Sequence, residues 1–182
     1  MDSLLASIGQ LKGRARKHLN DLCLQETEQV KILISSCVLG NTVRWNGSSR
    51  LDEEIAKWAR DNGCELVPVC PEHELFGTPR KPIRLMQSGE HVVASMGNAD
   101  VASLLGSKCD EIAHRHSDAV GFIGISNSPS CGLAVGVKGR GSTMKAFMHQ
   151  ALDCPTTEIN SMRSEANREL FLKRIKKYVK KT

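Results

Sequence analysis

The chain has 182 residues, which is long enough for one domain with a continuous core and too short for two domains of ordinary size. Hydrophobic residues make up 40% and charged residues 25%, close to globular averages, so collagen-like and disordered classes are excluded. No apolar run approaches the roughly 20 residues that a membrane helix needs, and residues 1–20 lack the apolar core of a secretory signal. We therefore expect a cytoplasmic protein with one catalytic or binding site and no membrane contact.

The net charge of +5 is concentrated at the C-terminus. Residues 163–182 hold eight basic and two acidic side chains, so the rest of the chain has a net charge of −1. A terminal block of like charge is usually a solvated helix face. With four Phe, two Trp and one Tyr, the chain also offers few rings on which single-stranded nucleic acid can stack. Nucleic-acid binding is not favoured, although the basic end keeps it open.

Apolar spacing predicts an amphipathic helix over residues 3–24, followed by alternating strands and helices. Buried strands are expected at residues 31–36, 65–69, 119–125 and 155–159. Helices are expected at residues 51–62, 99–116, 141–152 and 163–181. Three prolines and three glycines between residues 71 and 98 predict a long loop, with a small hairpin that pairs residues 84–85 with 91–94.

The alternation of strands and helices predicts an α/β fold, because parallel neighbouring strands need helical crossovers. We expect a three-layer, Rossmann-like architecture in which helices cover both faces of an open, mostly parallel sheet. In this interpretation residues 1–28 are a helical extension, residues 29–162 form the α/β domain, and residues 163–182 are a basic helix packed on the same domain.

Seven cysteines in a cytosolic chain do not suggest a disulfide framework, and no C-x-x-C pair is present. Cys37 and Cys70 directly follow the first two predicted strands, and Cys131 comes six residues after the third. The carboxyl ends of parallel strands share one edge of the sheet, where open α/β sheets bind ligands, so we expect these three thiols to converge. The remaining cysteines are expected to be small buried hydrophobic residues: Cys23, Cys64, Cys109 and Cys154.

Hydroxyl groups, backbone amides and turn residues surround the three convergent cysteines. Such donors tune the sulfurs of iron–sulfur clusters. A structural site normally takes four protein ligands, whereas a site with three can bind substrate or water and act as a Lewis acid. The sequence therefore favours a catalytic cluster or metal site, and an inert buried role for any single cysteine stays open.

Five motifs in order carry a resemblance to a known family: SSCVLG at 35–40, VRWNG at 43–47, PVCPE at 68–72, GTPR at 77–80 and SPSCG at 128–132. They resemble the thiouracil desulfidase family, long catalogued as a bacterial domain of unknown function. The resemblance covers roughly residues 30–160. Residues 79–85, 97–100 and 139–141 further resemble the branch of that family often joined to a second C-terminal domain.

The resemblance implies a [4Fe-4S] cluster held by Cys37, Cys70 and Cys131, with one iron left open. It also implies a hydrolytic, non-redox reaction in which the thiocarbonyl of a thiolated pyrimidine and water give a carbonyl and hydrogen sulfide. The substrate would be thiouracil, thiouridine or its nucleotide. Glu72, two residues after Cys70, is the expected proton-transfer group. Ser130 is a second expected catalytic residue, and His73 is a weaker acid–base candidate.

Further polar residues in the same connecting segments are expected to bind substrate. Ser36 and Ser128 can hydrogen-bond cluster sulfide or ring atoms, although a backbone cap is an equal alternative. Arg44, Arg80 and Arg140 can bind a substrate phosphate, although a solvated surface role stays open for each. The run Gly139–Arg140–Gly141 is expected to open a helix whose amides cradle phosphate.

Two other functions stay open from the sequence. In one, the basic terminal helices hold a thiolated tRNA as the substrate. In the other, the same thiols serve a cluster-free hydrolase or a zinc protein. The sequence is compatible with a monomer or a homodimer, and with sulfur at ring position 2 or 4 of the pyrimidine.

Overall fold

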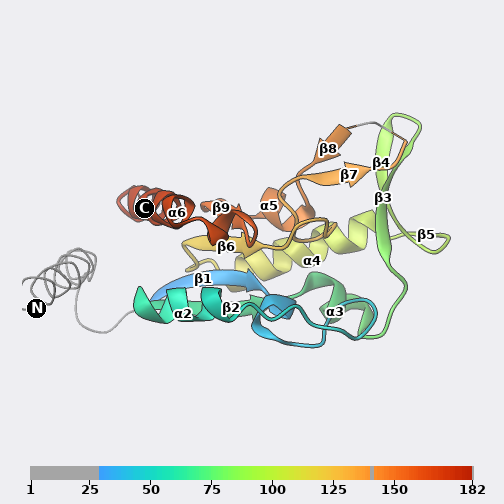
Figure 1. Ribbon diagram of the computed structural model, residues 1–182. Coiled ribbons are helices and arrows are strands. Elements are labelled where there is room, and N and C mark those ends of the chain that lie inside the picture. Colours follow the sequence, from blue (N-terminus) through green and yellow to red (C-terminus); the bar gives the residue numbers. More distant parts are fainter. Residues whose placement is uncertain (1–28, 140–141, 182) are drawn as a thin grey trace, which may run out of the picture.

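A computed structural model describes residues 29–139 and 142–181. The expected helix over residues 3–24, Cys23 and Arg140 lie outside these described residues. A four-stranded central sheet has the order β2-β1-β6-β9 (Figure 1). Its strands are β1 (Val30–Ser35), β2 (Cys64–Val69), β6 (Gly121–Gly124) and β9 (Thr156–Glu158). All neighbouring pairs are parallel, which confirms the four predicted strands and their direction.

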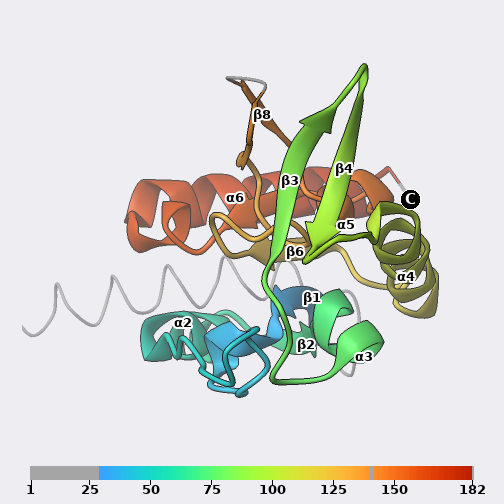
Figure 2. The same cartoon turned by 90° about the vertical axis from the view of Figure 1, so that its right-hand side faces the viewer.

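Helices cover both faces of this sheet, as Figure 2 shows. On one face lie α2 (Glu53–Asp61) and α6 (Glu165–Val179), which meet where the rings of Trp58 and Phe171 have centroids 6.4 Å apart. On the other face α4 (Ala102–Arg115) packs against α3 (Pro71–Phe76) and α5 (Phe147–Ala151). The predicted three-layer α/β class is therefore confirmed.

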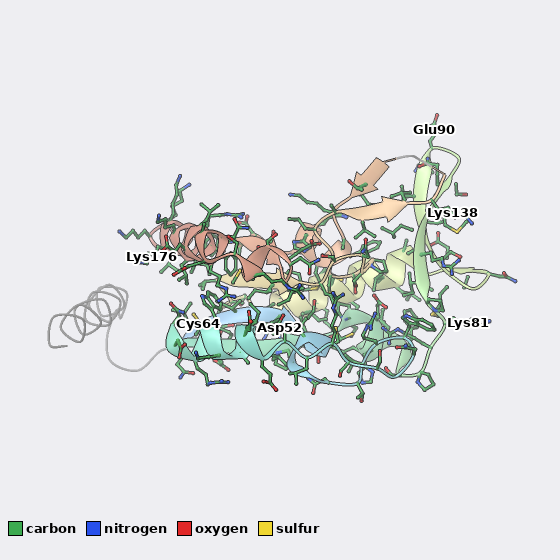
Figure 3. The ribbon with its side chains drawn as sticks, viewed as in Figure 1. Asp52, Cys64, Lys81, Glu90, Lys138 and Lys176 are labelled. Carbon is green, nitrogen blue, oxygen red and sulfur yellow. The ribbon has the colours of Figure 1, made fainter. Side chains whose placement is uncertain are left out.

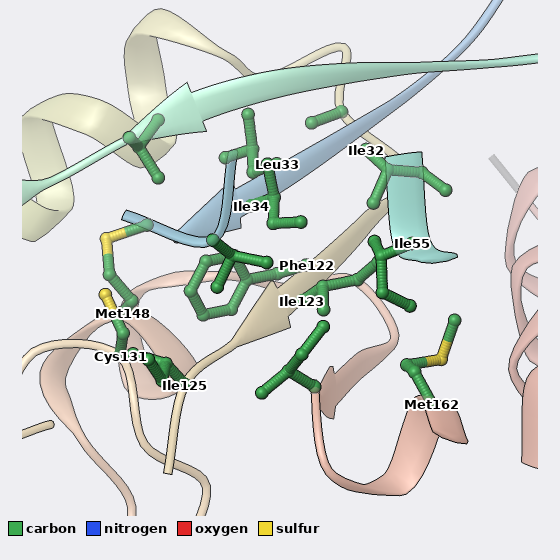
Figure 4. Packing of buried hydrophobic residues seen from close by; sticks show 14 of the residues in the cluster. Ile32, Leu33, Ile34, Ile55, Phe122, Ile123, Ile125, Cys131, Met148 and Met162 are labelled. Atoms are coloured by element: carbon green, nitrogen blue, oxygen red, sulfur yellow. The ribbon is translucent and has the colours of Figure 1, made fainter. Parts of the chain in front are cut away.

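The core lies around the two middle strands. Ile32, Leu33 and Ile34 of β1 and Phe122 and Ile123 of β6 are fully buried. Such continuous apolar runs are typical of parallel strands that are covered on both faces, and each buried side chain stabilises the fold by about 1.5–3 kcal/mol. Figure 4 shows these residues packed together, with Cys131 at the end of the core where β6 stops.

Two helices begin later than predicted, and in each an aspartate side chain accepts a hydrogen bond from a backbone N–H of the first turn. Asp52 accepts a hydrogen bond from the Ile55 backbone N–H at 3.2 Å, so α2 begins at Glu53. Asp100 accepts one from the Ala102 N–H at 2.9 Å. Asp100 also belongs to the short strand β5 (Ala99–Asp100), which pairs with β4, so α4 begins only at Ala102.

The prediction of a long loop over residues 71–98 was wrong in two respects. The segment opens with helix α3, and its hairpin has full six-residue strands, β3 (Ile83–Ser88) and β4 (His91–Met96). The predicted helix over residues 141–152 is confirmed only in its second half, α5, because β8 (Ser142–Met144) pairs with β7 (Val135–Val137) before α5 begins.

A second, smaller core explains why residues 142–144 form a strand where the apolar spacing predicted a helix. Apolar side chains of the β3–β4 hairpin pack with those of β7 and of the residues just before α5, including Leu85, Ala94, Val137 and Ala146. This tertiary contact favours strands where the spacing alone suggested a helix. Gly139 therefore leads toward strand β8, and the predicted phosphate cradle at a helix N-terminus over residues 139–141 is wrong.

The basic helix α6 packs on the central sheet through Phe171 and Ile175, which are buried in the main core. Figure 3 shows Lys176 of this helix at the end of the molecule opposite Glu90, at the tip of the β3–β4 hairpin. The hairpin lies beyond the carboxyl edge of the central sheet (Figure 1). Across the described ranges, no helix is both long enough and apolar enough to cross a membrane.

Candidate functional site

A cavity of about 220 Å³ opens at the carboxyl edge of the central sheet. Cys37, Cys70 and Cys131 all line it, so the structure brings together the three thiols that the sequence placed at strand ends. The volume is below the roughly 300–1,000 Å³ of sites for drug-sized ligands, so the cavity suits a small ring. Glu72, Ser36, Arg44, Arg80, Ser128 and Ser130 also line this cavity.

Each thiol is held by a different local structure. Cys37 lies in a short 3-10 helix, Ser36–Leu39, directly after β1, and its carbonyl accepts the Arg50 N–H at 2.8 Å. Cys70 is the cap residue of α3, followed by Pro71 in the first turn, where proline is favoured. Cys131 lies in the loop after β6, and its N–H donates to Ser128 Oγ at 3.2 Å.

Burial keeps these thiols protonated in the absence of a ligand. It raises the pKa of Cys70 to about 11 and that of Cys131 to about 12. Burial also raises the pKa of Cys37, while the Arg44 and Arg50 guanidinium groups counteract that effect. A thiolate at Cys37 would further raise the pKa of Cys70, and a thiolate at Cys70 would further raise that of Cys131. All three must lose a proton to bind a metal.

Glu72 is the buried carboxylate of the cavity, with 7% of its surface exposed. Its Oε1 accepts hydrogen bonds from Ser130 Oγ at 2.7 Å and from Ser128 Oγ at 3.4 Å. Its Oε2 accepts one from Arg80 Nη2 at 2.8 Å. Two hydroxyl groups and a guanidinium therefore hold a charged acceptor beside Cys70, at the position that the sequence suggested for proton transfer.

Arg80 is bound mainly by the protein itself. Besides Glu72, its guanidinium donates through Nη1 to the carbonyl oxygens of Val43 at 2.9 Å and Gly77 at 3.0 Å. The Arg80–Glu72 ion pair is buried, with 5% and 9% of the two side chains exposed. These contacts favour a role for Arg80 in holding Glu72 over the phosphate contact that we expected.

The mouth of the cavity carries more exposed side chains. Arg44 is half-buried and donates to Ser48 Oγ at 3.3 Å, which leaves donors of its guanidinium for other partners. Trp45, 45% exposed, lines the same opening with Arg50 and Arg84. The opening is therefore basic and carries one exposed indole ring.

Three comparisons bear on the family of this chain. The family model described as 2-thiouracil desulfurase matches residues 32–158. The chain belongs to this family. An uncharacterized protein, YbbK of Bacillus subtilis strain 168, is 33% identical over 113 residues, which cover 56% of this chain and 72% of that relative. The family assignment agrees with the resemblance carried by the five sequence motifs.

A solved structure of the [4Fe-4S]-dependent thiouracil desulfidase TudS has a TM-score of 0.57 to this chain and is 23% identical. The match covers 75% of this chain and 95% of the TudS chain. At this level of identity the likeness shows a shared fold. The α/β architecture described above is thus the architecture of a solved thiouracil desulfidase.

The three thiols of the cavity are of the donor type that holds iron–sulfur clusters. Within residues 29–139 and 142–181, no three His, Cys, Asp or Glu side chains are arranged to hold one metal ion. A cubane cluster has its irons at separate corners, so its thiolate ligands need not converge on one point. Ser35 Oγ is buried beside Cys131, whose pKa it lowers, and no described residue binds it within ordinary hydrogen-bond geometry. Such a hydroxyl suits a cluster sulfur.

Among the described residues, the other histidines and cysteines do not line the cavity. His73 pairs with Thr78 Oγ1 at 2.7 Å and is exposed outside the cavity. Cys109 is fully buried in α4, and Cys64 is buried at the start of β2. Cys154 is partly buried and packs against the main core.

Sequence reasoning did not single out several polar residues in the cavity or beside it. Ser35 ends β1, and Asn127 follows β6 in the left-handed region at φ 61°, where asparagine is tolerated. Glu158 ends β9, and the loop of Cys131 hydrogen-bonds to it. The rule that identified the cysteines, convergence of strand carboxyl ends, also applies to these residues and was not extended to them.

Proposed function

We propose that this chain is a [4Fe-4S]-dependent desulfidase that removes sulfur from a small thiolated pyrimidine by hydrolysis. One observation carries the proposal: three cysteines from three strand ends line a single small cavity together with a buried carboxylate. Membership of the 2-thiouracil desulfurase family supports the substrate class. The overall reaction is balanced without an electron donor, since thiocarbonyl plus water gives carbonyl plus hydrogen sulfide.

Cys37, Cys70 and Cys131 are the residues that would hold the cluster. When bound, a cluster with three protein ligands supplies an open, Lewis-acidic iron with affinity for a soft sulfur atom. Ser35 and Ser130, which lower the pKa of Cys131, would donate hydrogen bonds toward sulfur. The cavity's burial excludes bulk water from these groups and strengthens their electrostatic interactions.

Glu72 moves the proton in this mechanism. Its carboxylate lines the cavity and accepts a proton from the water that attacks the carbon bearing sulfur. The departing sulfur takes up protons to leave as hydrogen sulfide. Arg80 and Ser130 fix the two oxygens of Glu72, so the side chain keeps one orientation throughout.

Ser36, Ser128 and Arg44 orient the substrate. The Ser36 hydroxyl accepts from Asn41 Nδ2 at 2.8 Å, which leaves its own O–H to donate toward a ring oxygen or nitrogen. Arg44, at the mouth, is placed to bind an anionic group attached to the ring. Arg140, outside the described residues, keeps its expected role as a second phosphate contact.

The test is anaerobic reconstitution of the full chain with iron and sulfide, followed by sulfide-release assays on thiouracils, thiouridines and their monophosphates. We expect turnover without any reductant and, in ¹⁸O-labelled water, one labelled oxygen in the product carbonyl. Turnover that requires a reductant would overturn the hydrolytic reaction. Turnover by iron-free or zinc-loaded protein would instead support the cluster-free hydrolase.

A further inference from the structure

The fourth strand of the central sheet ends in a carboxylate where the other three strands lead to cysteines. β9 ends at Glu158, which lies opposite Gly124 at the end of β6. Glu158 is not among the described residues that line the cavity. Its carboxylate therefore does not contact a substrate bound in the cavity.

Both oxygens of Glu158 bind the loop that carries Cys131. Oε1 accepts a hydrogen bond from the backbone N–H of Leu133, and Oε2 accepts one from Ser126 Oγ at 2.9 Å. Asn160 Nδ2 in turn donates to Ser126 Oγ at 3.0 Å, which fixes the direction of the serine O–H. Ser126 lies near the start of this loop and Leu133 near its end, so the Glu158 side chain binds the loop at both ends.

The middle of the loop is packed from two other directions. The Cys131 carbonyl accepts a hydrogen bond from His149 Nε2 at 2.9 Å. The same carbonyl lies against Gly124, where an added Cβ would be 1.9 Å from the oxygen. The Cys131 backbone therefore packs against β6 and hydrogen-bonds to α5, and Glu158 of β9 hydrogen-bonds to the loop that carries Cys131.

We propose that Glu158 is a positioning residue that sets the place of Cys131 relative to Cys37 and Cys70. This inference rests on the proposed function, in which the three thiols share one cluster. Cys37 and Cys70 come within two residues of the ends of β1 and β2, whereas Cys131 comes seven residues after the end of β6 and needs an external anchor. A carboxylate suits this task because both of its partners are donors.

The experiment compares Glu158→Ala and Glu158→Gln with the wild-type full chain. As a matched control, Glu74→Ala removes a carboxylate near Cys70 that binds Arg115 instead of a cysteine loop. The first measurement is the rate of iron loss from reconstituted protein to a ferrous chelator. The second is the alkylation rate of each cysteine in iron-free protein by iodoacetamide, resolved by mass spectrometry.

We expect Glu158→Ala to weaken iron retention roughly 10–100-fold, as the loss of an outer partner of a metal site does. Alkylation should become faster at Cys131 and stay unchanged at Cys37. Glu158→Gln keeps an acceptor for Leu133 N–H and should restore most of the wild-type behaviour, and Glu74→Ala should match wild type. If Glu158→Ala fails to fold, Ser126→Ala removes one of the two anchors and should show the same selective alkylation.

Wild-type iron retention and unchanged Cys131 alkylation in Glu158→Ala would overturn the inference. Equal acceleration at all cysteines would also overturn it, because that pattern reports general destabilisation. Failure of the proposed function has a different signature. In that case wild-type protein holds no cluster or releases no sulfide, while the alkylation pattern still reports the anchor at Glu158.

Discussion

Two sets of cysteines in this protein have similar burial and different surroundings. One set lines the cavity, and the other set is Cys64, Cys109 and Cys154. Burial raises the pKa of every one of these six thiols, to about 11 in both Cys70 and Cys64. Neither burial nor pKa therefore separates a candidate ligand from a structural thiol.

Position in the fold separates them. The cavity thiols share their surroundings with the Glu72 carboxylate, the Arg80 guanidinium and several hydroxyl groups. Cys109 is instead fully buried in α4 and packs within the main core. The cavity thiols thus lie past the carboxyl ends of parallel strands, where open α/β sheets bind ligands, whereas Cys109 lies within a helix.

Substitution of the three cavity cysteines is expected to have the largest effect. We expect Cys37→Ser, Cys70→Ser and Cys131→Ser each to abolish sulfide release, because a hydroxyl is a poor ligand for iron compared with a thiolate. Sulfide release and bound iron per chain are the measurements. Activity that survives in any one of the three variants would remove that cysteine from the ligand set.

The second largest effect is expected from Glu72, the carboxylate that lines the cavity with the three thiols. Glu72→Gln keeps the shape of the side chain but removes the proton acceptor, so kcat should fall about 10²–10⁴-fold. The change also leaves the buried Arg80 without its ion pair, which costs about 3–5 kcal/mol. Urea unfolding measures that cost separately from turnover.

Glu74→Gln is the control for Glu72→Gln, since Glu74 lies in the same helix and pairs with Arg115 at a more exposed position. Its kcat should stay at the wild-type level. A kcat within a few-fold of wild type in Glu72→Gln would assign proton transfer to another group.

The central sheet and the convergence of the cavity thiols could be predicted from the sequence, because both depend on local signals. Apolar runs mark the buried strands, and a cysteine after such a run has its place set by the direction of the strand. The β7–β8 pair was missed because its strands are stabilised by the second core, which includes Leu85 from a distant segment. The anchor at Glu158 was missed because its partners, Leu133 and Ser126, are 25 and 32 residues away in the chain.

A third prediction tests how closely the Cys131 loop must approach β6. In Gly124→Ala the new Cβ would meet the Cys131 carbonyl oxygen at 1.9 Å, so the loop must move. We expect a loss of about 1–3 kcal/mol in the free energy of unfolding, as in other overpacked cores, together with reduced iron retention. Gly136→Ala is the control, because its Cβ would meet no atom within 4 Å. Equal stability of the two variants would show that the loop is less constrained than the packing indicates.

Substitution of a cysteine outside the cavity should have the smallest effect. Cys109→Ala removes one heavy atom from a fully buried position, so we expect a loss of about 1 kcal/mol in the free energy of unfolding. Cys109→Ser should cost more, since a buried hydroxyl without a partner costs roughly 1–3 kcal/mol. Both variants should bind as much iron as wild type and release sulfide at the wild-type rate. A loss of iron in Cys109→Ala would mean that the two sets are not separate, and that α4 contributes to the site from behind the cavity.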